Sequence, residues 1–177
     1  MRDNWTGAAP AWTARPWRRK GGRRNRPKPD GSQAQPGTKR HVVVDRRGTP
    51  LGVRLSPANR HDSLMLAATL DAVPGVRHGR GRPRKRPKKL HADKAYDHRR
   101  CRAECRARSI RARIARRGVD SSEKLGRHRW VVERTLAWLN RFRRLTVHYE
   151  RRAVMHQAFL PQAASLICWS YVQRWLG

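Results

Sequence analysis

Apolar positions along the first half of the chain predict a hairpin followed by a helix. Residues 41–45 form a short β-branched run, a turn-like stretch follows, and residues 50–56 return as a second strand. Two such runs joined by a tight turn are typical of a β-hairpin, with Asp45 in a turn role. Apolar residues then recur at helical spacing over residues 64–73, which predicts a helix of about three turns with Asp62 as its N-cap.

The second half alternates strand, helix, strand and helix. Residues 89–92 form a strand-like run that ends at Asp93, residues 98–108 suit a helix, and residues 109–114 alternate as a strand does. Residues 126–144 place apolar side chains at helical spacing, which gives one stripe to bury. The predicted class is therefore α/β.

The C-terminal stretch, residues 154–175, is the most hydrophobic in the chain, and we expect it to pack as a helix against the sheet. Pro161 interrupts it. An interior proline costs about 3 kcal/mol and favours a kink or a break, which predicts two shorter helices or one bent helix.

Residues 1–38 show no periodic apolar pattern. They contain several prolines and glycines and a cluster of basic residues, so we expect a disordered arm, followed by one domain over residues 39–177. Trp5, Trp12 and Trp17 are unusual in such an arm. They indicate either stacking on bases or sequence that was not selected as the N-terminus of this protein.

Charge narrows the class of partner. The chain carries 43 Lys and Arg against 12 Asp and Glu, a formal net charge of +31. Basic residues occur from end to end, which favours a nucleic-acid partner, although a bias towards Arg also follows genome composition. Residues 75–89 (GVRHGRGRPRKRPKK) contain no acid. We expect this loop to grip phosphates, including through Arg84, Lys85, Arg86 and Lys88, with a merely solvated loop as the alternative.

Two other classes are disfavoured. No apolar run approaches the roughly 18 residues of a membrane span, and the N-terminus lacks the apolar core of a signal peptide, so we expect a cytoplasmic, nucleoid-associated protein. Cys101, Cys105 and Cys168 are too few for a disulfide framework. Cys101 and Cys105 lie four apart on one helix face, but no second pair at finger-like spacing follows, which favours free thiols over zinc.

Two carboxylates are candidates for chemistry. Asp93 follows a strand, where side chains point into the crevice in which open α/β sheets bind ligands, and Lys94 beside it suits phosphate handling. A turn or helix-cap role is the plainer alternative for Asp93. Glu133 lies beside the apolar stripe of a helix rich in arginine, where it is either a site residue or an ion-pair partner.

Three long segments carry a family resemblance. They are PGTKRHVVVDRRGTPLGVRLSPANRHDS, KKLHADKAYDHRRCR and GRHRWVVERTLAWLNRFRRLTVHYERRA. From about residue 36 to the C-terminus the chain closely resembles DDE-type transposases of the insertion sequence 5 family. The resemblance implies an incomplete ribonuclease-H-like fold, with a mixed sheet, flanking helices and a helical C-terminus.

The resemblance also implies site residues and cofactors. Asp93 matches the second catalytic aspartate of the family and Glu133 matches its glutamate, both as ligands of Mg²⁺ or Mn²⁺. Arg129 matches the arginine of the family's tyrosine-arginine-glutamate-lysine signature. Asn140 stands where the lysine is expected, although Arg141 or Arg143 can supply the charge. The implied partners are double-stranded DNA, as element ends and target, and a further copy in a homo-oligomer.

One expected residue is missing. The first aspartate of the family belongs on a strand before the hairpin, yet residues 8–17 contain no acid, and Asp3 and Asp30 lie in no strand-like context. The helix-turn-helix-like N-terminal domain usual in the family is missing as well. The sequence is therefore interpreted as a truncated or frameshifted transposase.

A two-metal site needs a bridging carboxylate, so we expect little cleavage or strand transfer by this chain alone, while DNA binding persists. The alternative is a non-catalytic basic protein that binds DNA or RNA, and a ribosome-associated protein is a weaker third reading.

Overall fold

A computed structural model describes residues 38–77, 79–116, 118, 123–147, 149–150 and 152–176, with only the backbone described for residues 123–129. The predictions for residues 1–37 lie outside this part of the chain. No helix in these ranges is long and apolar enough to cross a membrane.

The predicted hairpin is confirmed. Strand β1 (Thr38–Val44) pairs antiparallel with β2 (Pro50–Pro57), and the register shifts between Val43 and Val44. Asp45 has the predicted turn role, because its carboxylate accepts hydrogen bonds from the backbone N–H groups of Arg47 and Thr49, both at 2.8 Å. The turn also needs Gly48, which adopts a φ of 86°.

A second pair of strands is parallel. Strand β3 (Lys89–Ala92) is followed by the 3-10 helix η2 (Lys94–Tyr96) and by helix α2 (Arg99–Ala107), after which β4 (Arg111–Ile114) returns beside β3. Parallel neighbours need such a helical crossover. The helix and strands expected here are therefore confirmed to within two residues at their ends.

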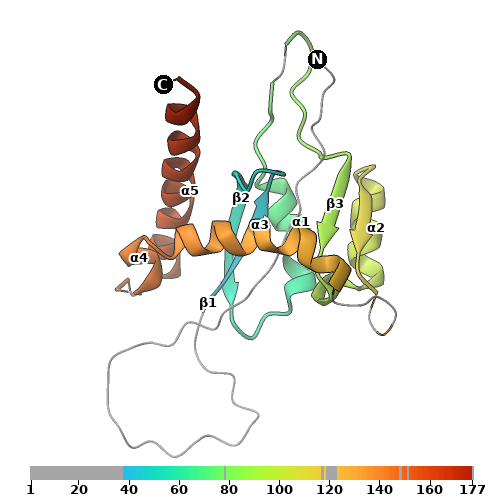
Figure 1. Cartoon of the computed structure of the whole chain (residues 1–177). Helices are drawn as coiled ribbons and strands as arrows, with labels where there is room; N and C mark the ends of the chain where they lie inside the picture. The colour runs from blue at the N-terminus through green and yellow to red at the C-terminus, as the bar shows by residue number, and fades with distance from the viewer. Residues whose placement is uncertain are drawn as a thin grey trace, which may run out of the picture.

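The remaining helices surround the strands (Figure 1). The 3-10 helix η1 (Asp62–Met65) continues into α1 (Leu66–Asp71), and α3 (Glu123–Leu139), α4 (Arg143–Thr146) and α5 (Ala153–Leu176) complete the chain. The fold is α/β with a helical C-terminus, as predicted. A mixed sheet contains antiparallel and parallel strand pairs, and both kinds of pair occur. Within the described residues, however, they form two separate two-stranded sheets.

Strand β1 contributes to two hydrophobic cores. Val43 packs with α1, β3, α2 and β4, in a cluster that includes Leu66, Leu90 and Tyr96. Val42 and Val44 point to the other face, where they pack with residues of α3, α4 and α5. Because successive strand residues face opposite sides, one short strand serves both clusters.

Three helix predictions need correction. Asp62 is not the N-cap of the helix after the hairpin. His61 is, because its ring nitrogen accepts from the backbone N–H of Ser63, while Asp62 pairs with Lys39. The helix expected over residues 126–144 begins at Glu123 and ends at Leu139, with α4 separate. The C-terminal segment is one continuous helix that contains Pro161, so the two-helix alternative is wrong.

Candidate functional site

Asp93 lies where β3 ends. Leu90 and Ala92 anchor the strand in the core, and the backbone leaves it in an extended conformation at Asp93. The carboxylate accepts a hydrogen bond from the backbone N–H of Lys94 at 2.6 Å, which caps η2. The cap role considered for Asp93 is thus present, and the half-buried side chain lies at the predicted carboxyl end of the strand.

The 3-10 helices η1 and η2 lie side by side, and two imidazoles meet beside them. Burial raises the pKa of Tyr96, and the charges of Asp62 and Asp93 raise it further. The rings of His61 and His98 meet edge to face with their centroids 4.7 Å apart. Asp62 entered the sequence prediction mainly as a helix cap, whereas His61 and His98 were not predicted as site residues. The sequence feature that could have indicated His61 and Asp62 is the segment NRHDS, which lies within the first of the three segments that resemble the family.

The segment around His61 is held in place by the start of α2. The carbonyl of Ser63 accepts from Arg100 Nη2 at 3.1 Å and from Cys101 Sγ at 3.5 Å. On the hairpin side, Lys39 Nζ lies 2.9 Å from Asp62 Oδ1. Contacts from both β1 and α2 therefore fix the loop beside Asp93.

Glu133 lies on α3, on the shoulder predicted for it. Val131 and Val132 are buried and Glu133 is exposed. The next residue, Arg134, stacks between Trp130 and Trp138 and donates to the backbone carbonyl of Arg47.

The structure does not assemble a metal site from the described residues. Within the described residues, no three His, Cys, Asp or Glu side chains are grouped as metal ligands. The roles of Asp93 and Glu133 as catalytic residues and metal ligands stay predictions. Cys101, Cys105 and Cys168 form no disulfide, and the first two are buried.

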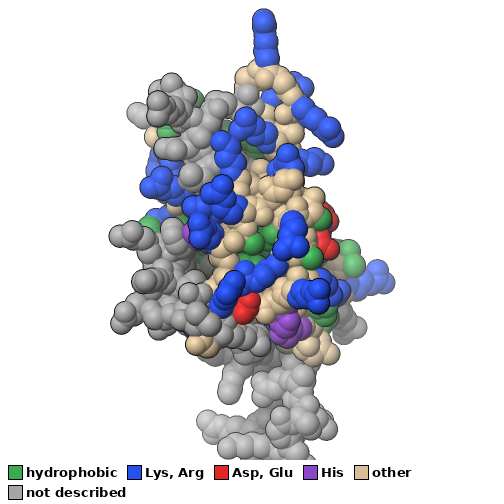
Figure 2. Space-filling model, turned by 90° about the vertical axis from the view of Figure 1, so that its right-hand side faces the viewer, with side chains coloured by type: hydrophobic (Ala, Val, Ile, Leu, Met, Phe, Trp, Pro, Cys, Tyr) green, Lys and Arg blue, Asp and Glu red, His purple; other side chains and the backbone are tan. Residues whose placement is uncertain are grey.

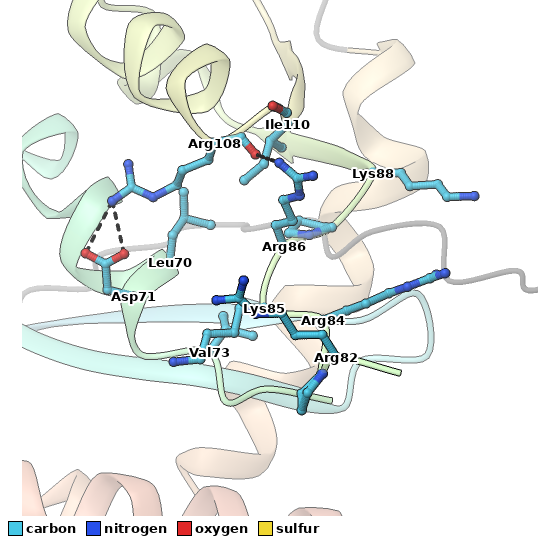
Figure 3. Close-up of a pocket in the computed structure, with 13 residues that line it drawn as sticks. Leu70, Asp71, Val73, Arg82, Arg84, Lys85, Arg86, Lys88, Arg108 and Ile110 are labelled. Atoms are coloured by element: carbon cyan, nitrogen blue, oxygen red, sulfur yellow. Dashed lines mark hydrogen bonds and ion pairs between the residues drawn. The ribbon is translucent and has the colours of Figure 1, made fainter. Parts of the chain in front are cut away.

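The basic loop forms one wall of a cavity of about 1020 Å³ (Figure 3). A pair of backbone hydrogen bonds between Val76 and Arg84, at 2.8 and 2.9 Å, closes the loop into a narrow projection. Apolar side chains of Leu70, Val73 and Ile110 contribute to the cavity lining. Six cations also line it: Arg82, Arg84, Lys85, Arg86, Lys88 and Arg108.

Two of these cations are restrained by hydrogen bonds or ion pairs with other residues of the protein. Arg86 Nη1 donates to the carbonyl of Arg108 at 3.2 Å. Arg108 pairs with Asp71 at 3.0 Å and with Glu104. Burial lowers the pKa of Arg108, but the hydrogen bonds to Asp71 and Glu104 outweigh that effect and raise it. Within the described residues, the side chains of Arg84, Lys85 and Lys88 make no ion pair.

The cavity and Asp93 lie at opposite ends of β3. Lys88 immediately precedes the strand and Asp93 immediately follows it. Four strand residues span about 13 Å. Figure 2 views the side of α2 and β4 and shows Lys and Arg side chains spread over that face, with few Asp or Glu.

The other predicted DNA-binding residues are dispersed. Lys94 is half-buried beside Asp93, and Arg141 is exposed between α3 and α4. Arg143, the first residue of α4, is exposed, and its Nε donates to the Tyr149 hydroxyl at 3.2 Å. The side chain of Arg129 lies outside the described residues. Asn140, which replaces an expected lysine, accepts a hydrogen bond from Arg40 Nη1 at 2.6 Å. Of the predicted set, only the four residues of the basic loop come together.

Comparisons with known proteins identify the family. Residues 12–168 match the family described as "Transposase DDE domain". A putative transposase for insertion sequence element IS402 from Burkholderia cepacia is 46% identical over 142 residues, which cover 80% of this chain and 67% of that protein.

Solved structures give more distant likenesses. The catalytic core domain of BIV integrase has a TM-score of 0.44 at 16% identity, covering 90% of this chain and 79% of that one. A chain of a simian T-cell lymphotropic virus intasome, in complex with PP2A regulatory subunit B56 gamma, has a TM-score of 0.42 at 13% identity. That match covers 95% of this chain and half of the other. The extent of the family match and the 46% identity decide the assignment: the chain belongs to the DDE-domain family of insertion-sequence transposases.

Proposed function

We propose that this transposase chain binds double-stranded DNA through its basic loop and has little strand-cleaving activity by itself. The observation that carries the proposal is the cavity lined by six cations, of which only Arg108 has an ion-pair partner in the described residues. Unpaired cations around a hollow keep their charge available to phosphates. DNA held in this way, as element end or target, would keep the protein on the nucleoid.

The balance of charge within the cavity favours a polyanion over a small apolar ligand. Asp71 is the one carboxylate among the lining residues, and it is already paired with Arg108. Pro83 and Pro87 restrict the backbone of the loop, whose base packs beside the apolar side chains of the lining. Each phosphate that they neutralise releases condensed counterions, which makes the affinity depend on salt.

The test compares two triple variants with equal charge. One replaces Arg84, Lys85 and Lys88 by Ser. The matched control replaces Arg46, Arg54 and Arg99, which are exposed and lie outside the cavity lining. Fluorescence anisotropy with a short duplex, over a series of salt concentrations, gives the slope of log K against log salt.

The loop variant should lose about 0.9 in slope per lost phosphate contact, about 2.7 in all, and at least tenfold in affinity at low salt. The control should lose much less. If the two variants lost the same affinity and slope, DNA binding would depend only on the net charge of the protein, and the loop proposal would be abandoned.

The proposal of weak cleavage rests on the carboxylates. In a two-metal phosphodiester reaction, Mg²⁺ or Mn²⁺ requires several oxygen ligands around two ions about 3.5–4 Å apart. Asp93 and Glu133 are the candidate ligands, and residues 8–17, where the resemblance expects a further aspartate, contain no acid. This observation also favours the alternative function, a DNA-binding protein without catalysis.

Mn²⁺-dependent nicking of a duplex that carries the element's own end separates the two functions. We expect nicking by the wild-type chain to equal that of the double variant Asp93→Ala, Glu133→Ala. A wild-type rate clearly above that of the double variant would mean that the two carboxylates still act in catalysis.

A further inference from the structure

We propose that α5 is a self-association surface, through which two copies of this chain pair helix against helix. The inference goes beyond the proposed DNA binding, because it concerns a different face of the molecule. It starts from an unusual property of α5, whose outward side is apolar in a strongly basic protein.

The first part of α5 is buried against the described rest of the chain, and the later part contacts it along one side through Cys168, Tyr171 and Trp175. Its buried residues are His156, Leu160, Ala163, Ala164 and Ile167. No residue from 168 to 176 is buried. A helix of 24 residues is about 36 Å long. Figure 1 shows the C-terminal part of α5 (dark red) continuing past the hairpin with no other described element over its outer side.

The exposed residues of α5 follow a heptad spacing. Steps of three and four residues in strict alternation connect seven exposed positions: Met155, Ala158, Gln162, Ser165, Trp169, Val172 and Leu176. We call this set the α5 stripe. Such alternation places all seven on one face of the helix, and it is the pattern by which two helices pack side chains into each other. The stripe therefore fits a helical partner better than a flat surface.

Charge identifies the partner as a second copy. The α5 stripe contains no Lys, Arg, Asp or Glu, although the chain has 43 basic residues among 177. The flanking positions are uncharged too: Val154, Phe159, Pro161, Leu166, Cys168, Gln173 and Trp175. Two copies that each carry +31 repel one another over most of their surface, so they can approach closely only where charge is lacking. A helix laid against its own copy along this stripe brings no charged residue of the stripe into the contact, and Arg47, 5.5 Å from the Trp175 ring, lies at its edge.

The exposed area suits a stable contact. Trp169 and Trp175 are 56% and 74% exposed, and Leu176 is 81% exposed. With about 150–250 Å² per aromatic side chain, the two tryptophans alone offer roughly 250 Å², near a third of the roughly 800 Å² that each partner buries in a typical interface. Leu166, Val172, Met155 and Val154 are further exposed apolar side chains of α5, and an exposed apolar surface of this extent marks an interaction site.

The test measures mass in solution with the full chain. Light scattering after size exclusion, at high salt and after nuclease treatment, prevents DNA from bridging copies. The stripe variant is Trp169→Glu with Leu176→Glu. The matched control is Ala153→Glu with Ser170→Glu, two exposed positions on the opposite side of α5 that add the same charge. Because all four residues are exposed, each variant should keep the wild-type far-ultraviolet circular dichroism.

Wild type and control should have the mass of two chains at tens of micromolar, and the stripe variant the mass of one. Introduced cysteines give an independent readout, since Ser165→Cys should form an intermolecular disulfide under mild oxidation faster than Ser170→Cys. A monomeric wild type, or a dimeric stripe variant, would overturn the proposal. If the wild type is monomeric and neutral lipid vesicles cover the α5 stripe, the surface would be assigned to a membrane, and the proposal would also fall.

Discussion

The imidazole Nε2 of His41, on β1, lies 2.7 Å from the hydroxyl Oγ of Ser56, on β2, and both residues are buried. Desolvation of this ring lowers the pKa of His41 from 6.5 to about 4, with the charges of Lys39 and Arg60 acting in the same direction against that of Asp62. The hairpin thus contains a histidine that is neutral at ordinary pH.

We predict that His41 makes the protein less stable as the pH falls. Between pH 6.5 and about 4 the unfolded chain binds a proton on this ring that the folded chain does not bind. The contribution of His41 to the free energy of unfolding is therefore fully present above pH 6.5 and is lost as the pH falls towards 4. The full loss is about 3 kcal/mol. Urea unfolding of wild type and His41→Gln over this pH range measures it. The variant should lose stability less steeply, and identical pH profiles would refute the assignment.

Gly48 to Ala should destabilise the contact between the hairpin turn and α3. At a φ of 86°, a Cβ would lie 3.0 Å from both Arg134 Nη2 and Thr135 Oγ1. Backbone strain and this crowding together should cost about 1–3 kcal/mol in chemical denaturation. Gly79→Ala is the control, since that glycine also has a positive φ of 68° but no atom within 4 Å of its Cβ. A Gly79 variant as unstable as the Gly48 variant would mean that α3 plays no part.

Cys101 and Cys105 should resist thiol reagents in the native protein. Both are fully buried, and desolvation raises their pKa values, that of Cys105 to about 11, so the reactive thiolate is scarce at pH 8. Titration with a disulfide reagent should detect the half-buried Cys168 first and the other two only after unfolding. Rapid reaction of all three thiols in the folded state would contradict the burial described above.

Removal of the carboxylate in the basic cavity should tighten DNA binding. Asp71→Asn deletes the only acid among the lining residues and frees Arg108 from one partner. A unit charge acting over about 4 Å in water is worth about 1 kcal/mol, so we expect a gain of about threefold to fivefold in affinity at low salt. Asp97→Asn, at the other end of β3, should have a smaller effect in the same anisotropy assay. Unchanged affinity in the Asp71 variant would place the DNA elsewhere.

Local patterns predicted the strands and α2 well because their signals are contained within the elements. The β-branched run before Asp45 and the turn after it define the hairpin without help from distant residues. The cap at η1 was misassigned for the opposite reason. Lys39, more than twenty residues earlier in the chain, binds the carboxylate of Asp62, and His61 is left to cap the helix. Such a contact is invisible to local sequence patterns.

Local sequence patterns also could not predict where α3 ends or how close Asp93 and Glu133 lie to each other. The apolar spacing continues to Phe142, but α3 ends at Leu139, where Arg40 reaches Asn140 from β1 and Thr146 Oγ1 donates to the Asn140 carbonyl at 2.6 Å. For the site, the sequence placed Asp93 and Glu133 correctly within their own elements. How closely the two approach depends on the packing of α3 on the sheets, and that is set by contacts far apart in the chain.

The position of β1 between two hydrophobic cores has a consequence for folding. A slip of one residue in its pairing with β2 would turn Val43 out of one core and Val42 and Val44 out of the other at the same moment. A hairpin in the wrong register therefore loses the stabilising burial of its valines in both cores. The two halves of the protein should consequently unfold together, in a single cooperative transition, although their strands belong to separate sheets.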